Sequence, residues 1–284
     1  MLHSTAYKDA SAIFKITITL MAVWLLVQAT GPSVALADDK YELEGGKEAA
    51  VLGSSAILFG LGLWVDRGYE PLTPEEIAKL DPATINRFDR AATGRWSPGA
   101  ATASDIMVYT TMAAPISLTL TDQGSREAGT IGVMYLETML LQGAMTFLAK
   151  NSFERTRPYV YNDNPDIPLA LKMEKTSRRS FYSGHTSSAF ASMVFLASVF
   201  ERLYPDSSAR GWVWGGCMAA AATTGYLRYA AGRHYPTDIL VGAAVGAFVG
   251  YVVPSLHELE ADGPGAPGSG KSRRSITLGI TMGF

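Results

Sequence analysis

The sequence predicts an all-α protein, a bundle of six helices, and three observations support this class. Six apolar segments of helix length follow one another, separated by polar loops. These segments are rich in glycine and alanine, which let neighbouring helices pack closely. Hydrophobic residues make up 48% of the 284 residues, which is enough for a sizeable core. The predicted helices run roughly over Glu48–Val65, Ala103–Leu120, Thr130–Ala149, Ser187–Leu203, Gly211–Ala230 and Asp238–Val253.

Ahead of these helices, residues 1–37 have the pattern of a secretory signal peptide. Lys8 and Lys15 precede an apolar core, Ile16–Ala29, and Ala35-Leu-Ala37 offers a small-x-small cleavage site before Asp38. The pattern predicts export followed by cleavage. The alternative is a first membrane anchor that is kept, although this apolar core is short for a span.

Two helical regions are expected after the signal peptide. Residues 38–102 hold the first helix and a charged loop, in which Thr73-Pro-Glu-Glu76 indicates a helix start. Residues 103–257 hold the other five helices. These are only moderately apolar, because residues such as Asp105 and Glu137 interrupt them, and the mean hydropathy of the chain is +0.11. A membrane bundle and a soluble bundle therefore both fit the pattern.

The last part of the chain, residues 258–284, is predicted to be a linker followed by a strand-like tail. Asp262–Gly270 is rich in glycine, proline and serine, and Ser275–Phe284 alternates apolar and polar residues. A single strand cannot close a membrane barrel. We therefore expect the tail to pair weakly with a sheet edge or to stay disordered.

Charge and cysteine content narrow the functional classes. The net charge is only −2 and the chain has no long basic run, so no nucleic-acid partner is expected. Cys217 is the single cysteine, which excludes an intrachain disulfide. Its alanine-rich surroundings predict a buried, inert thiol.

The candidate catalytic residues are concentrated in three short stretches, which contain two of the four histidines. In the last stretch, His234 and Asp238 are four residues apart, and Pro236 suits the first turn of a helix. Asp238 can then accept a hydrogen bond from one imidazole nitrogen, which leaves the other nitrogen free to attack. Arg228 ends the preceding helix and can grip two phosphate oxygens at once.

The middle stretch, Tyr182-Ser-Gly-His185, opens a predicted helix. Backbone N–H groups near Ser183 and Gly184 can therefore point at an anion, and glycine permits close approach of that anion. His185 is then placed to protonate a leaving oxygen.

The first stretch supplies two further cations. Lys150 ends the third predicted helix, and Arg157 follows seven residues later, just before Pro158. Each group has an ordinary alternative when taken singly: a surface histidine, a cation at a membrane boundary, or a local helix pair. Their joint order, spacing and position at helix ends favour a common phosphate site.

Together the three stretches resemble the signature of the type 2 phosphatidic acid phosphatase superfamily, which also holds bacterial acid phosphatases and vanadium haloperoxidases. The family pattern is Lys-x6-Arg-Pro, then Pro-Ser-Gly-His, then Ser-Arg-x5-His-x3-Asp. The first motif is complete in Lys150–Pro158, whereas Tyr182 replaces the proline of the second and Leu227 replaces the serine of the third. The resemblance covers about Ala103–Pro254 and implies the helical bundle of this superfamily. Neither departure touches a charged or nucleophilic position.

The resemblance implies a metal-independent reaction through a phosphohistidine. His234 would attack phosphorus, Asp238 would orient it, and His185 would protonate the leaving alkoxide and then activate water. The other groups would hold the phosphoryl oxygens. No cofactor is expected, and no His/Asp/Glu cluster at ligand spacing indicates a metal site. The predicted phosphate-binding residues are Lys150, Arg157, Ser183, Gly184 and Arg228.

The expected substrate is a phosphorylated lipid, such as phosphatidic acid, phosphatidylglycerol phosphate, a polyprenyl pyrophosphate or lipid A. The alternatives are a periplasmic non-specific acid phosphatase acting on small esters, a vanadium haloperoxidase, and a non-catalytic membrane or transport protein. The haloperoxidase is less favoured, because we recognise no additional halide-directed histidine. The protein is expected in the cell envelope, either in the inner membrane or in the periplasm, with its site facing the periplasm.

Overall fold

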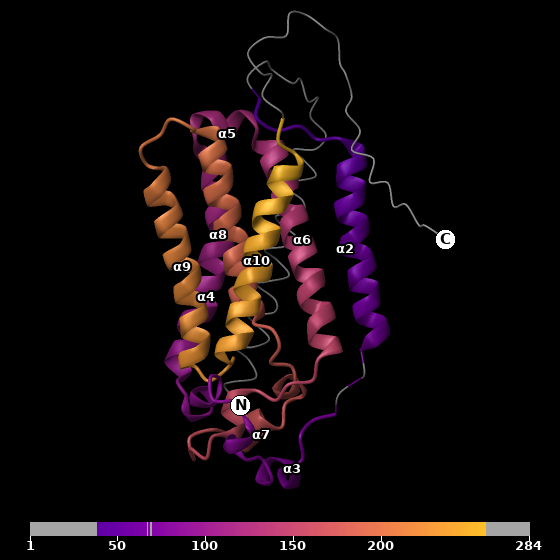
Figure 1. Ribbon diagram of the computed structural model, residues 1–284, viewed down its shortest axis with the longest axis vertical. Helices are drawn as coiled ribbons and strands as arrows, with labels where there is room; N and C mark the ends of the chain where they lie inside the picture. The colour runs from indigo at the N-terminus through magenta and orange to yellow at the C-terminus, as the bar shows by residue number, and fades with distance from the viewer. Residues whose placement is uncertain (1–38, 67, 69, 260–284) are drawn as a thin grey trace, which may run out of the picture.

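The computed structural model describes residues 39–66, 68 and 70–259, and this part of the chain is helical (Figure 1). Short 3-10 turns and two isolated β-bridges complete it. The predicted all-α class is confirmed. The α-helices are α2 (Gly45–Val65), α3 (Pro74–Ala78), α4 (Pro98–Ala113), α5 (Asp122–Arg126), α6 (Ala128–Ser152), α7 (Leu169–Lys172), α8 (Gly184–Leu203), α9 (Arg210–Ala230) and α10 (Pro236–Leu256).

The described part thus holds nine α-helices, where the sequence predicted six segments. The difference arises because the short helices α3, α5 and α7 form in the predicted loops. The helix start at Thr73 is confirmed, since its side chain and that of Glu76 form a capping box. The predicted signal peptide lies outside the described residues, and so does nearly all of the predicted tail, from residue 260 onward.

The second predicted helix differs most from the structure. It begins earlier, at Pro98, because the Ser97 hydroxyl accepts a hydrogen bond from Ala100 N at 3.1 Å and Pro98 suits the first turn. It also ends earlier, at Ala113. The chain continues as the 3-10 helix Ala114–Leu120, whose second residue, Pro115, has no N–H to donate.

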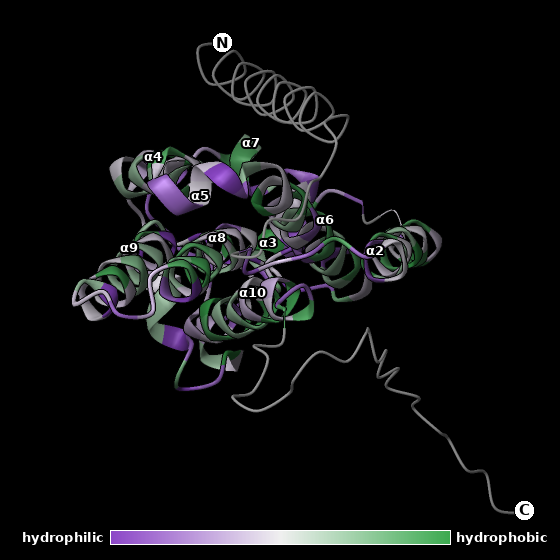
Figure 2. Cartoon of the chain, turned by 90° about the horizontal axis from the view of Figure 1, so that it is seen from above, coloured by the Kyte–Doolittle hydropathy of each residue, from purple (hydrophilic) through white to green (hydrophobic). Residues whose placement is uncertain are grey.

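Helix α8 lies in the middle of the bundle and packs closely on α10 (Figure 2). Two glycines of α10 make this approach possible. A Cβ atom at Gly246 would meet Ser187 O at 2.1 Å, and one at Gly250 would meet Ala191 O at 2.3 Å. The two backbones are therefore in direct contact where the first half of α8 lies against the middle and second half of α10.

The long helices lie side by side, and the ends that matter for chemistry meet at one end of the bundle (Figure 1). The C-terminal end of α6 and the N-terminal ends of α8 and α10 lie there, beside α3 and α7. Helix α2 forms one edge of the bundle against α6, and α9 forms the opposite edge (Figure 2).

Three of these helices, α2, α6 and α10, are long and apolar enough to cross a membrane. Large apolar side chains also face outward from several helices. Trp64 at the end of α2 is 82% exposed, and Trp212 at the start of α9 is 85% exposed. Such outward apolar surface is what a bundle in lipid presents.

Candidate active site

The turn between α9 and α10 holds His234 inside the protein. Helix α9 ends at Ala230, and Gly232 follows with a φ of +68°, a conformation that favours glycine. A Cβ atom there would meet Arg95 O at 2.1 Å. Arg233 N donates to Arg228 O at 3.0 Å and closes the turn. His234 is therefore buried between two helix ends, with 1% of its surface exposed.

Asp238 lies beside His234, but its carboxylate is mainly held by other groups. Its Oδ2 accepts hydrogen bonds from Ser180 Oγ at 2.6 Å and from Tyr235 N at 3.1 Å. His234 Nδ1 lies 3.5 Å from the same oxygen, an ion-pair distance rather than a hydrogen bond. Nδ1 has no hydrogen-bond partner in the described part of the chain. The two predicted groups are brought together, and a small shift would complete the bond.

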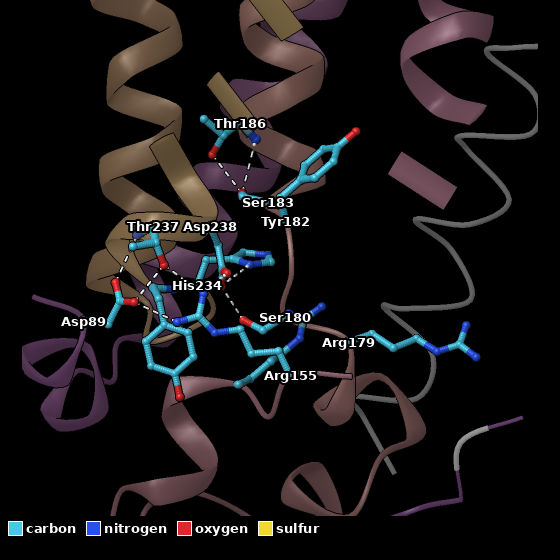
Figure 3. Close-up of polar contacts among 12 residues, drawn as sticks. Asp89, Arg155, Arg179, Ser180, Tyr182, Ser183, Thr186, His234, Thr237 and Asp238 are labelled. Atoms are coloured by element: carbon cyan, nitrogen blue, oxygen red, sulfur yellow. Dashed lines mark hydrogen bonds and ion pairs between the residues drawn. The ribbon is translucent and has the colours of Figure 1, made fainter. Parts of the chain in front are cut away.

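Behind Asp238, Arg155 and Asp89 extend the network (Figure 3). The Arg155 guanidinium donates a hydrogen bond from Nη1 to Asp238 Oδ1. It donates a second one from Nη2 to Asp89 Oδ2, at 2.7 Å. Asp89 is fully buried and also accepts from Thr237 N at 3.0 Å and Thr237 Oγ1 at 2.7 Å. The Arg155 guanidinium lies over the Tyr235 ring, 4.1 Å from its centre. The start of α10 is thus tied down by a carboxylate–guanidinium–carboxylate chain.

Three cations from different elements act on His234. Burial, and then the charges of Arg157, Lys150 and Arg228, hold the pKa of His234 well below its ordinary value. Lys150 Nζ donates to the carbonyl oxygens of Arg179 and Tyr182 at 3.2 and 3.1 Å. The imidazole is therefore neutral at neutral pH, the form that can attack an electrophile.

The second motif forms the start of α8, as its sequence predicted. Ser183 is the N-cap of this helix, and its hydroxyl accepts from Thr186 N at 3.4 Å. Ser183 N donates to Asp238 O at 3.0 Å, which joins the second motif to the third. A Cβ atom at Gly184 would lie 3.2 Å from Thr146 and 3.7 Å from Lys150, so this glycine lies close to the predicted cation.

His185 has a carboxylate partner that the sequence analysis did not assign. Its Nε2 lies 2.8 Å from Asp105 Oδ1, and the same oxygen lies 3.2 Å from Arg228 Nη1. Arg228 Nη1 also donates to Ser104 Oγ at 3.0 Å, while Arg228 Nε is buried without a hydrogen-bond partner among the described residues. A buried cationic donor with spare capacity is suited to an anion.

The structure brings the predicted site residues to one end of the bundle, and it adds four that were missed. Arg155 stood inside the first stretch, only two residues before Arg157. Asp105 was noticed only as a charge within an apolar segment, which is itself a signal of function. Asp89 and Ser180 carried no sequence signal that we recognise. In the residues that the structure describes, no group of three His, Cys, Asp or Glu side chains is arranged to hold a metal ion.

These features bring a buried imidazole, a carboxylate and several cations together at one end of the bundle. Comparison with known proteins identifies its family. The model of the PAP2 superfamily matches residues 131–261, which include all three motifs, and this region of the chain belongs to that superfamily.

Curated relatives are similar over the same region. A lipid A 1-phosphatase from Porphyromonas gingivalis is 35% identical over 112 residues, which are 39% of this chain and 20% of that protein. A lipid A 4'-phosphatase from Bacteroides thetaiotaomicron is 30% identical over 140 residues, 46% of this chain and 56% of the relative. A decaprenylphosphoryl-5-phosphoribose phosphatase from Mycobacterium tuberculosis is 28% identical over 118 residues, 41% and 60% of the two chains.

The chain therefore spans between a fifth and three fifths of the length of these relatives. Among solved structures, a transmembrane PAP2-type phosphatidylglycerolphosphate phosphatase from Bacillus subtilis matches with a TM-score of 0.38 and 18% identity. That match covers 72% of this chain and 95% of the other.

Proposed function

We propose that the protein is a metal-independent phosphatase that hydrolyses a phosphate monoester or pyrophosphate of a lipid through a phosphohistidine. The observation that carries this proposal is the neutral, buried imidazole of His234, placed beside Asp238 and among the cations Lys150, Arg157 and Arg228. Membership of the PAP2 superfamily and similarity to lipid phosphatases support it.

In the first step, Nε2 of His234 attacks phosphorus. The new P–N bond forms as the bond from phosphorus to the alkoxide breaks. His185 gives its proton to the departing oxygen. Before this transfer, Asp105 stabilises the protonated His185 ring, because Asp105 Oδ1 lies 2.8 Å from Nε2 of His185. The cations and the N–H groups at the start of α8 stabilise the charge that builds on the phosphoryl oxygens.

In the second step, water replaces the imidazole on phosphorus. His185, now neutral, takes a proton from this water as it attacks, and the P–N bond breaks to release inorganic phosphate. The first step creates positive charge on the His234 ring, which Asp238 stabilises, and the second step removes this charge as the P–N bond breaks. Arg155 and Asp89 hold Asp238 in place and act as positioning residues.

The substrate in this proposal is a phosphorylated lipid of the kind named by the relatives or a similar one, such as lipid A, a polyprenyl phosphate or phosphatidic acid. Three helices are long and apolar enough to cross a membrane, and the site lies at the ends of two of them, α6 and α10. A headgroup at the membrane surface would therefore meet the site. We place the protein in the inner membrane with this end facing the periplasm.

The test is phosphate release by the purified full chain in detergent micelles. We expect release from both phosphatidic acid and p-nitrophenyl phosphate without added metal and in the presence of a chelator. His234→Ala should abolish it, whereas His257→Gln, a change of the same residue type at the far end of the bundle, should leave it. Unchanged release by His234→Ala would refute the mechanism.

A further inference from the structure

A groove of about 350 Å³ lies beside the site, and the reaction proposed above does not use it. Its volume falls within the range of about 300–1,000 Å³ that is usual for small-molecule pockets. Residues of α2, α6 and α10 and of the segment before α8 line it, and nearly all of them are apolar. The lining residues are Leu58, Met145, Leu148, Ala149, Ser152, Phe153, Phe181, Tyr182 and Val241.

Three aromatic rings build the wall of this groove nearest the site. Phe181 packs edge-on against Phe153, with ring centres 5.3 Å apart, and against Tyr182, with ring centres 5.9 Å apart. Tyr182 is buried, whereas Phe153 is 56% exposed and lies at the mouth. Tyr182 is also the residue that replaces the family's proline, and its ring points away from the polar cluster around Asp238 (Figure 3).

The groove and the phosphate site share three stretches of backbone. Ala149 and Ser152 flank Lys150 on α6, and Lys150 Nζ donates to Tyr182 O at 3.1 Å. Tyr182 directly precedes Ser183. Val241 follows Asp238 by three residues, which is nearly one helical turn. A molecule with its phosphate at Lys150 would therefore have the groove directly beside it.

The groove leads from the site toward the middle of the bundle. Met145 lies five residues before Lys150, about 7.5 Å farther from the site end at 1.5 Å per residue. Leu58 lies seven residues before the end of α2, in the same direction. Because α2, α6 and α10 are the candidate spans, this direction points into the hydrocarbon layer.

The polar atoms in the lining are already satisfied. Ser152 Oγ donates to Leu148 O at 2.8 Å, and Tyr182 OH accepts from Thr146 Oγ1 at 3.2 Å. The groove thus offers nothing to bind a sugar or a charged headgroup, whose burial there would be unfavourable. It suits a hydrocarbon chain.

We propose that this groove binds the hydrocarbon chain of the phosphorylated lipid substrate, beginning with the carbons nearest the phosphate. This inference rests on the proposed function, because the phosphate held by the motif residues sets the position of the chain. Phe153, Phe181 and Tyr182 form the contact surface at the start of the groove, and Met145 and Leu58 continue it.

The kinetic test compares phosphatidic acid carrying long acyl chains with p-nitrophenyl phosphate, using the purified full chain. Val241→Trp fills the groove and Phe153→Ala removes its mouth. Each variant should lower kcat/KM for phosphatidic acid, relative to kcat/KM for p-nitrophenyl phosphate, about tenfold. This is the effect expected for losing part of one large apolar contact. Phe248→Ala, on the same helix as Val241 and 61% exposed outside the groove, should leave the ratio unchanged. Equal falls with both substrates, or an unchanged ratio in both groove variants, would overturn the inference.

A binding test separates this inference from the proposed reaction. Phosphatidic acid with a diazirine in its acyl chain is photolysed with the wild-type protein, and labelled peptides are identified by mass spectrometry. We expect label on the peptides that contain Phe153 and Val241, and much less from a phosphatidylcholine probe. Equal labelling by both probes indicates bilayer contact only. A crosslink from a photoreactive residue at position 241 to residues 1–38 indicates that this chain's own N-terminal segment fills the groove. Either result overturns the inference. Labelling as expected without any phosphate release would instead refute the proposed function.

Discussion

The two ends of the bundle each bury a histidine beside a carboxylate, and their electrostatics are opposite. At the site end, His234 is surrounded by cations, and its Nδ1 lies 3.5 Å from Asp238. At the far end, His257 is fully buried, and its Nε2 lies 2.8 Å from Glu137 Oε2. Burial is nearly equal, so the neighbours decide what each imidazole can do.

The pKa shifts of the two histidines reflect this difference. Burial and three cations lower the pKa of His234. Burial alone would also lower the pKa of His257, but the hydrogen bond and charge of Glu137 outweigh it and raise the pKa. His234 is kept as a neutral base, whereas the environment of His257 favours its protonated form, paired with Glu137. The first arrangement suits a nucleophile, and the second suits a structural tie between α6, α10 and the chain near Glu42.

The largest expected effect is on the proposed nucleophile. His234→Ala should lower kcat by about 10⁴-fold or more, because the covalent route is lost. The measurement is phosphate release from phosphatidic acid, with circular dichroism and melting to show that the variant is folded. A variant that is folded and active would place the nucleophile elsewhere.

Loss of the proposed general acid should have a substrate-dependent effect. We expect His185→Ala to lower kcat by about 10²–10⁴-fold for an alkyl phosphate, the usual contribution of general acid–base catalysis. The fall in the rate of imidazole phosphorylation should be smaller for p-nitrophenyl phosphate, because its leaving group needs no proton. Pre-steady-state nitrophenol release measures that step, and an equal fall for both esters would argue against an acid role.

Asp89 tests whether the network behind Asp238 positions the nucleophile. Asp89→Asn removes the charge that holds Arg155 and should lower kcat by about 10–100-fold, with little change in KM. Asp89→Glu restores the charge and should recover part of the activity. A change in KM alone, or no recovery with glutamate, would indicate a merely structural role.

A substitution at the far end of the bundle should change the stability of the protein rather than its catalytic activity. His257→Gln leaves Glu137 buried without its partner and should cost about 3 kcal/mol of folding free energy. The specific activity of the folded protein should stay at the wild-type value. Thermal melting and active-site titration together measure this, and a selective loss of kcat would break the contrast between the two ends.

The pH dependence should also differ between the ends. The raised pKa of His257 means that its ion pair stabilises the fold fully below about pH 6.5 and that this contribution is lost as the pH rises through the raised pKa. The lowered pKa of His234 means that the acidic limb of kcat/KM lies below pH 6.5, because only the neutral imidazole attacks. In Arg157→Gln the limb should move to higher pH, since one repelling cation is gone. A shift to lower pH would contradict the assigned cause.

Much of the site could be predicted from the sequence, because its motifs are local. His234 and Asp238 share one turn, and Ser183–His185 open one helix, so short-range rules place them. Asp89 could not be found in this way: it bonds to Thr237, which lies 148 residues away in the chain. Its position depends on how the loop before α4 folds against α10, and no local pattern encodes that contact.

The fold was predictable in class but less so at its boundaries. The early start of α4 at Pro98 follows from the cap at Ser97, a local signal that the apolar pattern did not include. His257 lies just past α10 without any motif, and its role depends on Glu137, 120 residues away. Contacts between residues on different helices depend on how α8 and α10 pack. The glycines permit this packing, but the sequence pattern alone does not specify it.

The central claim is that His234 carries the phosphoryl group. Rapid acid-free quenching of His185→Ala with ³²P-labelled p-nitrophenyl phosphate tests it most directly, because this ester needs no acid to leave and the variant lacks the base that activates water. We predict label that is stable to alkali and labile to acid, on the peptide containing His234, and none in the His185→Ala/His234→Ala double variant. Label on another residue, or turnover without any labelled protein, would contradict the account.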